Sequence, residues 1–236
     1  MNTQLNEHNQ PIGDPVLNWQ ERPYPGDMHC TGDYAIVTRL SIEHTQDLFE
    51  AYRASQPANW TYLSTEPPTD FATFEQSIAE KINHPAAVFY AVLDRETNCA
   101  LGMFSLMRID PKNGVVEVGN VIFSDALRRT RIATEAHELL ASYVFEELGY
   151  RRYEWKCDAL NKPSFRAAER LGFTYEGTFR HAVVYKGRSR DTAWFSMLAE
   201  EWPDRKRVFI KWLARDNFDD QGMQLKSLAE YREEEK

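Results

Sequence analysis

Arg128, Arg129 and Arg131 fall within four residues of one another, directly before a segment with helical spacing (SDALRRTRIATEAHELL, 124–140). A helix start leaves backbone N–H groups without intrahelical acceptors, and the helix dipole adds positive potential there. Together with basic side chains, such a start can bind a phosphate-bearing ligand. The segment has neither the glycine-rich Lys-Ser/Thr run of a P-loop nor a GxGxxG pattern. A solvated charged turn is the alternative.

The run VVEVGNVIF (115–123) has the composition of a strand and contains one carboxylate, Glu117. Period-two alternation places the following side chains on one face: Val115, Glu117, Gly119, Val121 and Phe123. We therefore expect apolar neighbours around Glu117, and such burial raises a carboxyl pKa and suits a general base. A structural glutamate hydrogen-bonded to a loop is an equal alternative. Gly119 also allows a bulge at this point.

The bulk composition narrows the class of protein. The 236 residues carry a net charge of −8, which argues against general nucleic-acid binding and is compatible with a cationic substrate such as an amine. Cys30, Cys99 and Cys157 lack metal-ligand or redox spacing, so no metal site is expected. We find neither a leader-like segment nor an apolar run of transmembrane length. A cytoplasmic protein without a membrane partner is expected.

Periodicity predicts one central domain with two extensions. Residues 1–28 are polar and proline-rich and are expected to form an extended arm, anchored by Trp19 and Tyr24. Residues 29–202 are expected to form the domain, and 203–236 a helix with a charged tail. The expected strands are 33–40, 86–95, 99–109, 115–123, 151–158, 173–185 and 191–199, with KGRSR (186–190) as the last turn. The expected helices are 41–53, 69–82, the one after the arginines, which Gly149 closes, and 162–172.

Four segments in this order carry a resemblance to a known family: EVGNVIF (117–123), LRRTRIATEA (127–136), NKPSFRAAERLGF (161–173) and RDTAWFSML (190–198). Together with the order of elements, they resemble the GNAT superfamily of acyl-CoA N-acyltransferases across about residues 30–202. The chain is most similar to the branch that acetylates ribosomal-protein N-termini. The resemblance implies an α/β fold with a mixed, mostly antiparallel central sheet flanked by helices.

The resemblance also implies a site for acetyl-CoA. The family's Q/R-x-x-G-x-G/A motif falls on Arg128 through Ala133, with Arg131 at the usual glycine position. That side chain must point away from the pyrophosphate or contact a phosphate itself. The implied cosubstrate-binding residues are Val121, Ile122, Phe123, Arg128, Arg129, Thr130, Arg131, Ile132, Ala133, Asn161 and Ser164.

In the family a glutamate on this strand deprotonates the amine, often through water, and Glu117 takes that position. Ser164 matches a serine near the sulfur, where it would assist the leaving thiolate; a cap or surface serine is the alternative. Asn161 would bond the pantetheine arm, although it also has the position of a helix N-cap.

The acceptor side is less defined in the sequence. Trp60 and Tyr62 would contact substrate, or simply belong to the core. Asp191 is expected to form a salt bridge with Arg188 or Arg190 rather than to attract an ammonium group. His137 is expected on the polar, solvated side of its helix.

The function implied is an N-acetyltransferase that moves an acetyl group from acetyl-CoA to a primary amine by direct attack. Deprotonation at pH 7 costs an α-amine about 1.4 kcal/mol and a lysine amine about 4.6 kcal/mol. This difference favours a peptide N-terminus or a small-molecule amine of low pKa. A homodimer is a further expectation. The alternative, motivated by Arg131, is a non-catalytic acyl-CoA-binding or interaction module on the same scaffold.

Overall fold

The computed structural model describes residues 4–235. The strands are β1 (Gln4–Leu5), β2 (Pro11–Ile12), β3 (His29–Thr31), β4 (Ala35–Arg39), β5 (Ala87–Asp94), β6 (Ala100–Asp110), β7 (Val115–Phe123), β8 (Arg152–Asp158), β9 (Thr174–Tyr185) and β10 (Arg188–Leu198). The α-helices are α1 (Thr45–Arg53), α2 (Phe71–Ile82), α3 (Arg131–Ser142), α4 (Lys162–Leu171), α5 (Trp202–Leu213) and α6 (Leu228–Glu234). Single helical turns are η1 (Ile42–His44), η2 (Pro57–Trp60), the π-helical η3 (Tyr143–Glu147) and η4 (Arg215–Asn217).

Eight of the strands form one sheet in the order β3-β4-β5-β6-β7-β8-β10-β9. Neighbouring strands are antiparallel throughout, except that β7 and β8 are parallel. A parallel pair needs a long crossover, and here the chain crosses through α3 and η3. The expected mixed, mostly antiparallel sheet flanked by helices is confirmed.

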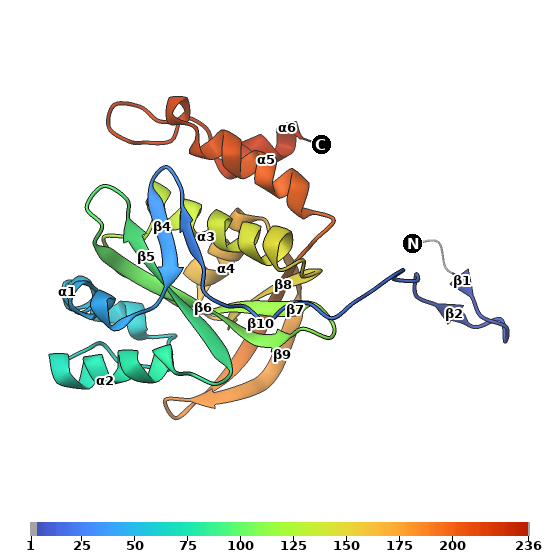
Figure 1. Cartoon of the computed structure of the whole chain (residues 1–236), viewed down its shortest axis with the longest axis horizontal. Helices are drawn as coiled ribbons and strands as arrows, with labels where there is room; N and C mark the ends of the chain where they lie inside the picture. The colour runs from blue at the N-terminus through green and yellow to red at the C-terminus, as the bar shows by residue number, and fades with distance from the viewer. Residues whose placement is uncertain (1–3, 236) are drawn as a thin grey trace.

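The helices cover both faces of this sheet (Figure 1). On one face, α1 and α2 pack on β5 and β6 through a core that includes Leu48, Tyr52 and Ile78. On the other face, α3, α4 and α5 share a larger core that includes Leu140 and Trp212. Each central strand therefore presents alternate side chains to two different apolar layers. This double coverage explains why β5 is buried along almost its whole length.

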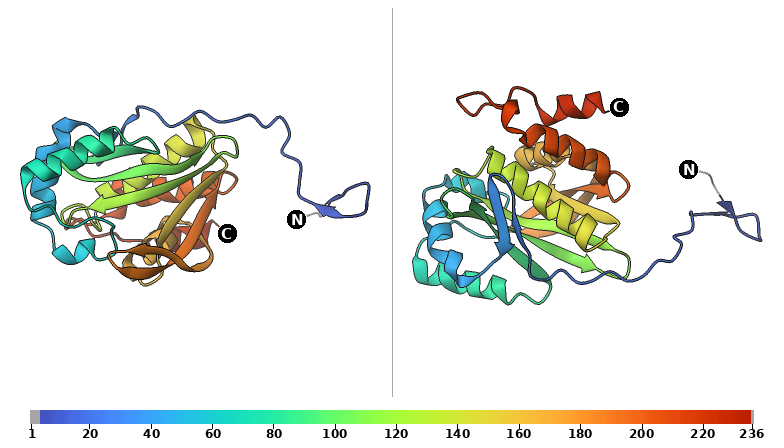
Figure 2. Two further views of the ribbon diagram at one scale, coloured as in Figure 1. Left: turned by 90° about the horizontal axis from the view of Figure 1, so that it is seen from below. Right: turned by 45° about the horizontal axis from the view of Figure 1, so that its top comes forward.

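The N-terminal segment leads away from the body, and β1 and β2 pair only with each other there (Figures 1 and 2). Attachment begins at Trp19, whose indole N–H donates to the Lys112 carbonyl at 2.8 Å. Half of the surface of Tyr24, the other expected anchor, is exposed. Pro25 is buried, and Met28 belongs to the core under α3.

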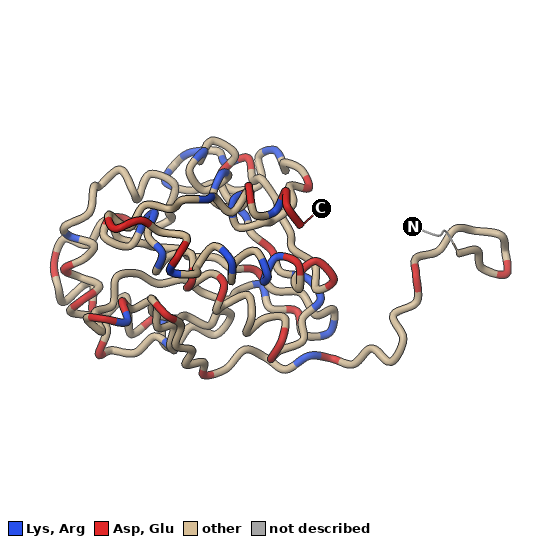
Figure 3. Tube along the Cα trace, turned by 90° about the horizontal axis from the view of Figure 1, so that it is seen from above, with Lys and Arg blue, Asp and Glu red and all other residues tan. Residues whose placement is uncertain are grey.

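At the other end of the chain, α5 begins at Trp202 with Pro203 in its first turn, as expected, and packs against α3. α6 then packs against α5, so the C-terminal segment lies over the α3 side of the sheet. Figure 3 shows acidic and basic residues interspersed over the body of the molecule.

The last hairpin differs from the expectation. Lys186 and Gly187 alone form the turn, with φ of 48° and 68°, and β10 begins at Arg188. Two left-handed residues match the twist of a tight hairpin. The expected five-residue turn is therefore wrong, and Arg188 and Arg190 are strand residues.

Candidate functional site

β7 is interrupted by a bulge at Asn120. Gly119 pairs with Ser105 and Ile122 with Met103, so two residues of β7 face one residue of β6. Asn120 has φ of 50°, and its amide donates to Ser105 Oγ at 2.9 Å. A Cβ on Gly119 would lie 2.3 Å from Met107 Sδ, so a larger residue here would displace the Met107 side chain. The bulge suggested by Gly119 is confirmed, one residue further along the chain.

The bulge changes which side chains share a face with Glu117. Before it, Val118 belongs to the core under α3, opposite to Glu117; after it, Phe123 and Val121 pack against that same core. Ile122 instead joins the core of α1 and α2. The expectation that Val121 and Phe123 share a face with Glu117 is therefore wrong, because the extra residue reverses the alternation.

The pairing between β7 and β8 ends just before the bulge of β7. Their parallel pairing runs from Val115 opposite Arg152 to Val118 opposite Trp155 and ends there. Further along, the residues of β7 pair with β6, and those of β8 pair with β10. Tyr52 fixes the far end of β7 by donating its hydroxyl to the Ile122 carbonyl at 2.8 Å. The sheet is thus opened between its two parallel strands.

The arginine loop leads into α3 at the end of β7. Thr130 is the N-cap: its hydroxyl oxygen accepts the Ala133 N–H at 3.1 Å. In residues 4–235, the backbone N–H groups of Arg129, Arg131 and Ile132 donate to no protein acceptor. These groups, with the helix dipole behind them, form an arrangement suited to an anion.

The three arginines of this loop have different partners. The Arg128 side chain donates to the Asn59 side-chain oxygen, and Asp125 lies nearby. Burial lowers the pKa of Arg128, and the neighbouring Arg129 lowers it further. Arg129 itself has φ of 61°, and in the described part of the chain its side chain forms no ion pair.

Arg131 points away from the helix start. Its guanidinium lies 4.7 Å from the ring centre of Tyr34 and 4.7 Å from that of Phe218, so it is held between two aromatic rings. The Tyr34 hydroxyl also donates to the Leu213 carbonyl at 3.0 Å, which ties the same region to the end of α5. Of the two positions expected for this side chain, the structure has the one directed away from the helix start.

Asn161 and Ser164 lie at the start of α4, beside the parallel part of β8. The Asn161 side-chain oxygen accepts the Ser164 N–H at 3.2 Å, which confirms Asn161 as an N-cap. Ser164 Oγ accepts from Trp155 Nε1 at 3.1 Å. Burial raises the pKa of the nearby Cys157 thiol, and Ser164 partly offsets this rise. These residues belong to the α3 side of the opening.

Glu117 lies on the opposite side of the sheet and is 6% exposed. The expectation of purely apolar neighbours is wrong, because its carboxylate lies 2.9 Å from Lys156 Nζ and 3.1 Å from Arg108 Nε. Burial still raises the pKa of Glu117, although Lys156 and Arg108 act in the other direction. Glu117 is thus a buried carboxylate with an elevated proton affinity and two cations in contact.

These contacts belong to a chain of charges that the sequence reasoning missed. Lys156 Nζ also lies 2.7 Å from Glu154, which in turn lies 2.7 Å from Arg152. Arg152 forms a bidentate pair with Glu176, at 2.5 and 2.8 Å, and this pair lowers the pKa of Glu176 to about 2. The signal was present in RRYEWKCD, where charged residues alternate with apolar ones, the pattern of a strand with one polar face.

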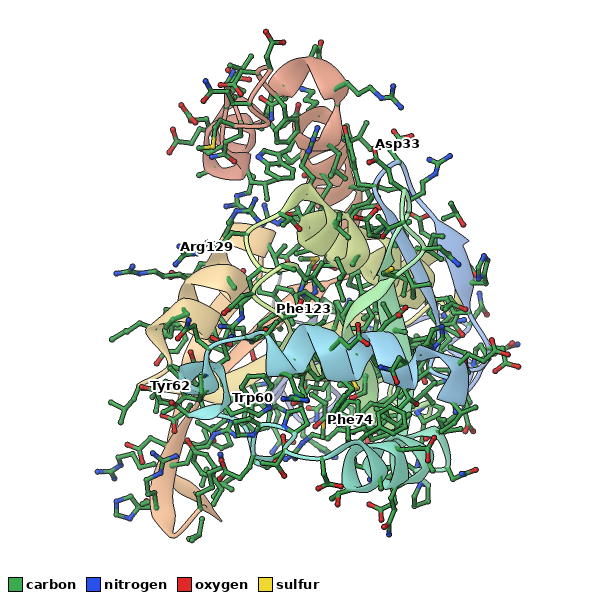
Figure 4. All side chains as sticks on the ribbon, turned by 90° about the vertical axis from the view of Figure 1, so that its left-hand side faces the viewer. Asp33, Trp60, Tyr62, Phe74, Phe123 and Arg129 are labelled. Atoms are coloured by element: carbon green, nitrogen blue, oxygen red, sulfur yellow. The ribbon has the colours of Figure 1, made fainter. Side chains whose placement is uncertain are left out.

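η2 lies across from the hairpin of β9 and β10, and Figure 4 shows Trp60 and Tyr62 in this region. Lys186 Nζ donates to the Trp60 carbonyl at 2.9 Å, and Arg188 donates to the Thr61 carbonyl at 2.7 Å. The Trp60 ring is buried in the core with Tyr52, whereas Tyr62 is half-buried. The core alternative therefore holds for Trp60, and Tyr62 remains available to a ligand.

His137 is buried, and the expectation of a solvated side chain is wrong. Its ring lies 5.4 Å from those of Phe123 and Trp155 and 5.6 Å from that of Phe104. Burial lowers the pKa of His137 to about 3. These three rings belong to β6, β7 and β8, so His137 lies on the face of α3 that packs against the sheet.

Asp191 does not form the expected salt bridge in the described residues. Its carboxylate accepts the His181 N–H at 2.7 Å, across a bulge where His181 has φ of 51°. Its role is thus to hold the irregular part of the hairpin.

Two further observations concern residues 4–235. None of their helices is long and apolar enough to span a membrane. Within the same range, no three or more His, Cys, Asp and Glu side chains are grouped so that they could hold a metal ion.

Comparison with known proteins identifies relatives of this architecture. Residues 36–174 match the model of an acetyltransferase (GNAT) domain. The crystal structure of a GCN5-related N-acetyltransferase from Brucella melitensis superimposes with a TM-score of 0.90; it is 43% identical and covers 92% of this chain and 100% of its own. An uncharacterised N-acetyltransferase of Bacillus licheniformis, p20, is 30% identical over 170 residues, which are 70% of this chain and 93% of p20. YdaF of Bacillus subtilis (strain 168), a proposed ribosomal N-acetyltransferase, is 33% identical over 105 residues, 44% of this chain and 57% of YdaF.

Proposed function

This chain belongs to the GNAT family of N-acetyltransferases, and we propose that its acceptor is the primary amine of a peptide N-terminus or of a small molecule. One observation carries the proposal. The parallel strands β7 and β8 separate directly beyond the level of Glu117, the buried carboxylate with a raised pKa. Acetyl-CoA supplies an activated acetyl thioester, and the opening would bring that thioester beside this carboxylate.

The residues around the opening fit the parts of acetyl-CoA. The free N–H groups of Arg129, Arg131 and Ile132, with the cationic side chains of Arg128 and Arg129, would hold the pyrophosphate. Thr130 and Ala133 shape this helix start through their capping hydrogen bond. The opened edge of β7, from Val121 to Phe123, would lie along the pantetheine arm, with Asn161 and Ser164 facing it from α4. A backbone N–H of that edge would stabilise the oxyanion.

On the other side of the sheet, Glu117 would accept a proton from the amine, directly or through one water molecule. The neutral amine nitrogen attacks the thioester carbonyl carbon, the C–S bond breaks, and the thiolate of CoA leaves. A thiol with a pKa of about 8.5 needs little assistance as a leaving group. Ser164 is the group on the α4 side that would hydrogen-bond the sulfur. No covalent enzyme intermediate is required.

The non-catalytic alternative was motivated by Arg131 at a position where the motif has glycine. The Arg131 side chain is held between Tyr34 and Phe218, and so it does not fill the space in front of the helix start. This placement of Arg131 supports the catalytic proposal over the non-catalytic alternative. A protein that bound acetyl-CoA but transferred nothing to any amine would restore this alternative.

The test is Glu117→Gln, which keeps the shape of the side chain and removes its basicity. We expect kcat to fall on the order of 10²-fold while the Kd for acetyl-CoA, measured by calorimetry, stays within about threefold. Glu75→Gln is the matched control, because Glu75 is exposed on α2. Unchanged turnover in Glu117→Gln would exclude Glu117 as the base.

A further inference from the structure

Three hydrogen-bond donors on β10 lack acceptors. Arg190 Nε, Thr192 Oγ1 and Trp194 Nε1 are buried atoms, and within residues 4–235 none of them has a hydrogen-bond partner. We call them the β10 donors. Buried polar atoms are nearly always hydrogen-bonded, and leaving one unpaired is destabilising. Three such atoms on alternate residues of one strand are donors for which the described residues supply no acceptor.

The β10 donors point to the same face of the sheet as Glu117. Ala193, Phe195 and Met197 fill the core under α3 and α4, so the alternate residues of β10 face the other way. In the register with β8, Trp194 lies opposite Lys156 and Thr192 opposite Asp158. Lys156 Nζ lies 3.7 Å from the Trp194 ring centre and also contacts Glu117, so this side chain lies between Trp194 and the proposed base.

The carboxylates of this face are already used. The two oxygens of Asp158 accept from the Leu160 N–H at 2.9 Å and from the Tyr185 hydroxyl at 2.7 Å. Glu154 is paired with Arg152 and Lys156. Among the described residues, no carboxylate lies within 4 Å of Arg190. The positive charge without a carboxylate partner on this face therefore belongs to Arg190, at the β9–β10 hairpin.

The composition of the hairpin supports this assignment of charge. Residues 179–190 contain Arg180, Lys186, Arg188 and Arg190 and no Asp or Glu, in a chain whose net charge is −8. Lys186 pairs with Glu66 at 2.9 Å, and Arg188 donates to the Thr61 carbonyl. Arg190 is thus the cation of the hairpin that combines a buried, unpartnered nitrogen with a place beside two further donors.

The nature of the donors defines the ligand group. Arginine and the tryptophan indole can only donate hydrogen bonds, and the threonine hydroxyl can also donate. A ligand group that pairs with these donors must accept hydrogen bonds, and the positive charge of Arg190 favours an anion such as a carboxylate.

We propose that the β10 donors form an anion subsite for the acceptor, so that the acceptor is a primary amine that also carries a carboxylate. This inference rests on the proposed function, because it places the amine at Glu117 and the carboxylate at Arg190, Thr192 and Trp194. Glu117 is paired with Glu154, and Thr192 is paired with Asp158. These two residues of β8 are four positions apart, so Glu117 and Thr192 are separated by about 13 Å along the strand direction. That separation fits a peptide with an acidic side chain among its first residues, and it does not fit a free α-amino acid.

The test uses acceptors that differ by one charge: the tripeptide amides Ser-Ala-Glu-NH2 and Ser-Ala-Gln-NH2, with free glutamate as the small anionic amine. We expect kcat/KM for the Glu peptide to exceed that for the Gln peptide about tenfold, and glutamate to be a poor acceptor. Arg190→Gln should bring the two peptides within about twofold of each other. Arg53→Gln, an exposed arginine of α1, should keep the preference. Equal kcat/KM for the two peptides in the wild type, or an undiminished preference in Arg190→Gln, would overturn the subsite; better use of glutamate than of the Glu peptide would refute the peptide assignment.

A binding measurement separates this inference from the proposed activity. The N-acetylated forms of the same two peptides carry no reactive amine, and their binding can be followed through tryptophan fluorescence. We expect tighter binding of the acetylated Glu peptide to the wild type, and loss of this difference in Arg190→Gln. If turnover fails but this difference persists, only the proposed activity is wrong. If both acetylated peptides bind equally or not at all, the subsite is wrong even in an active enzyme.

Discussion

Lys156 Nζ lies 2.9 Å from the Glu117 carboxylate, and both side chains are buried on the same face of the sheet. They come from the two parallel strands: Glu117 of β7 is paired with Glu154 of β8, two residues before Lys156. The position of this cation directly after the last paired level of the two strands makes it the main electrostatic partner of the proposed base. Burial raises the pKa of Glu117, and Lys156 limits that rise more than Arg108 does.

Removal of Lys156 should move the acidic limb of the pH–rate profile. The reaction needs Glu117 ionised, so activity falls as the pH drops through its pKa. Without the ammonium group the burial effect is less compensated, the pKa rises further, and the loss of activity should occur at higher pH in Lys156→Gln. Arg108→Gln should also move the acidic limb of the kcat/KM profile to higher pH, by a smaller amount. Coincident limbs in folded wild type and Lys156→Gln would show that Glu117 does not control the limb.

Arg131 should matter for stability and little for acetyl-CoA. Its contacts with Tyr34 and Phe218 fasten the segment after α5 to the β3–β4 hairpin, and each is worth about 0.5–1 kcal/mol. Arg131→Gly should lower the free energy of unfolding by about 1–2 kcal/mol in urea titrations and leave the acetyl-CoA Kd within about threefold. Arg129→Ala should instead weaken acetyl-CoA binding about tenfold with little change in stability. If calorimetry shows weaker acetyl-CoA binding for Arg131→Gly and unchanged binding for Arg129→Ala, Arg131 is the phosphate contact.

His137 should make the protein sensitive to mild acid. Its pKa is about 3 in the folded protein and about 6.5 when unfolded, so both states are neutral at pH 7 and no penalty exists there. Below about pH 6.5 the unfolded chain binds a proton that the folded protein excludes, which costs about 1.4 kcal/mol per pH unit. His137→Phe, which fits the surrounding aromatic rings, should therefore lose less stability than the wild type between pH 6.5 and 4. Parallel slopes in urea titrations at these pH values would contradict this assignment.

Glu135 should be a strong stabilising residue although it lies outside the proposed chemistry. Its buried carboxylate accepts the backbone N–H groups of Asp33, Tyr34 and Ala35 at 2.8, 2.7 and 2.6 Å. Glu135→Gln removes the charge and should lower the free energy of unfolding by about 2 kcal/mol. Glu138→Gln is the matched control, because that buried carboxylate accepts one hydrogen bond, from Ser142. Equal unfolding free energies for the two variants would argue against the turn-holding role of Glu135.

The sequence predicted the elements that position the site, because these depend on local signals. The spacing of apolar residues located α3, and Gly149, with φ of 68°, ends the helical segment where expected, after η3 has continued α3 to Glu147. Asn161 with Pro163 behind it marked the start of α4. The order of these elements and their motifs also predicted the family that the comparisons show.

The surroundings of the candidate site residues were harder to predict. Lys156 could be placed on the same face of its strand as Glu154, but nothing local tells which residue of β7 it meets. His137 was expected on the polar side of its helix, but its ring packs against Phe104, Phe123 and Trp155 of the sheet. The aromatic residues that bury it come from three different strands, which no pattern within one helix reveals.

The sequence by itself thus determined the architecture, the helix start that suits a phosphate, and the carboxylate on β7, because each depends on residues close together in the chain. The tertiary structure decided the bulge at Asn120, the contact of Lys156 with Glu117 and the direction of Arg131. Each of these depends on residues brought together from distant parts of the chain: Met107 and Ser105 beside the bulge, β8 beside β7, and Tyr34 and Phe218 around Arg131. Local periodicity defines which face a side chain occupies; only the packing of remote segments defines what that face contacts.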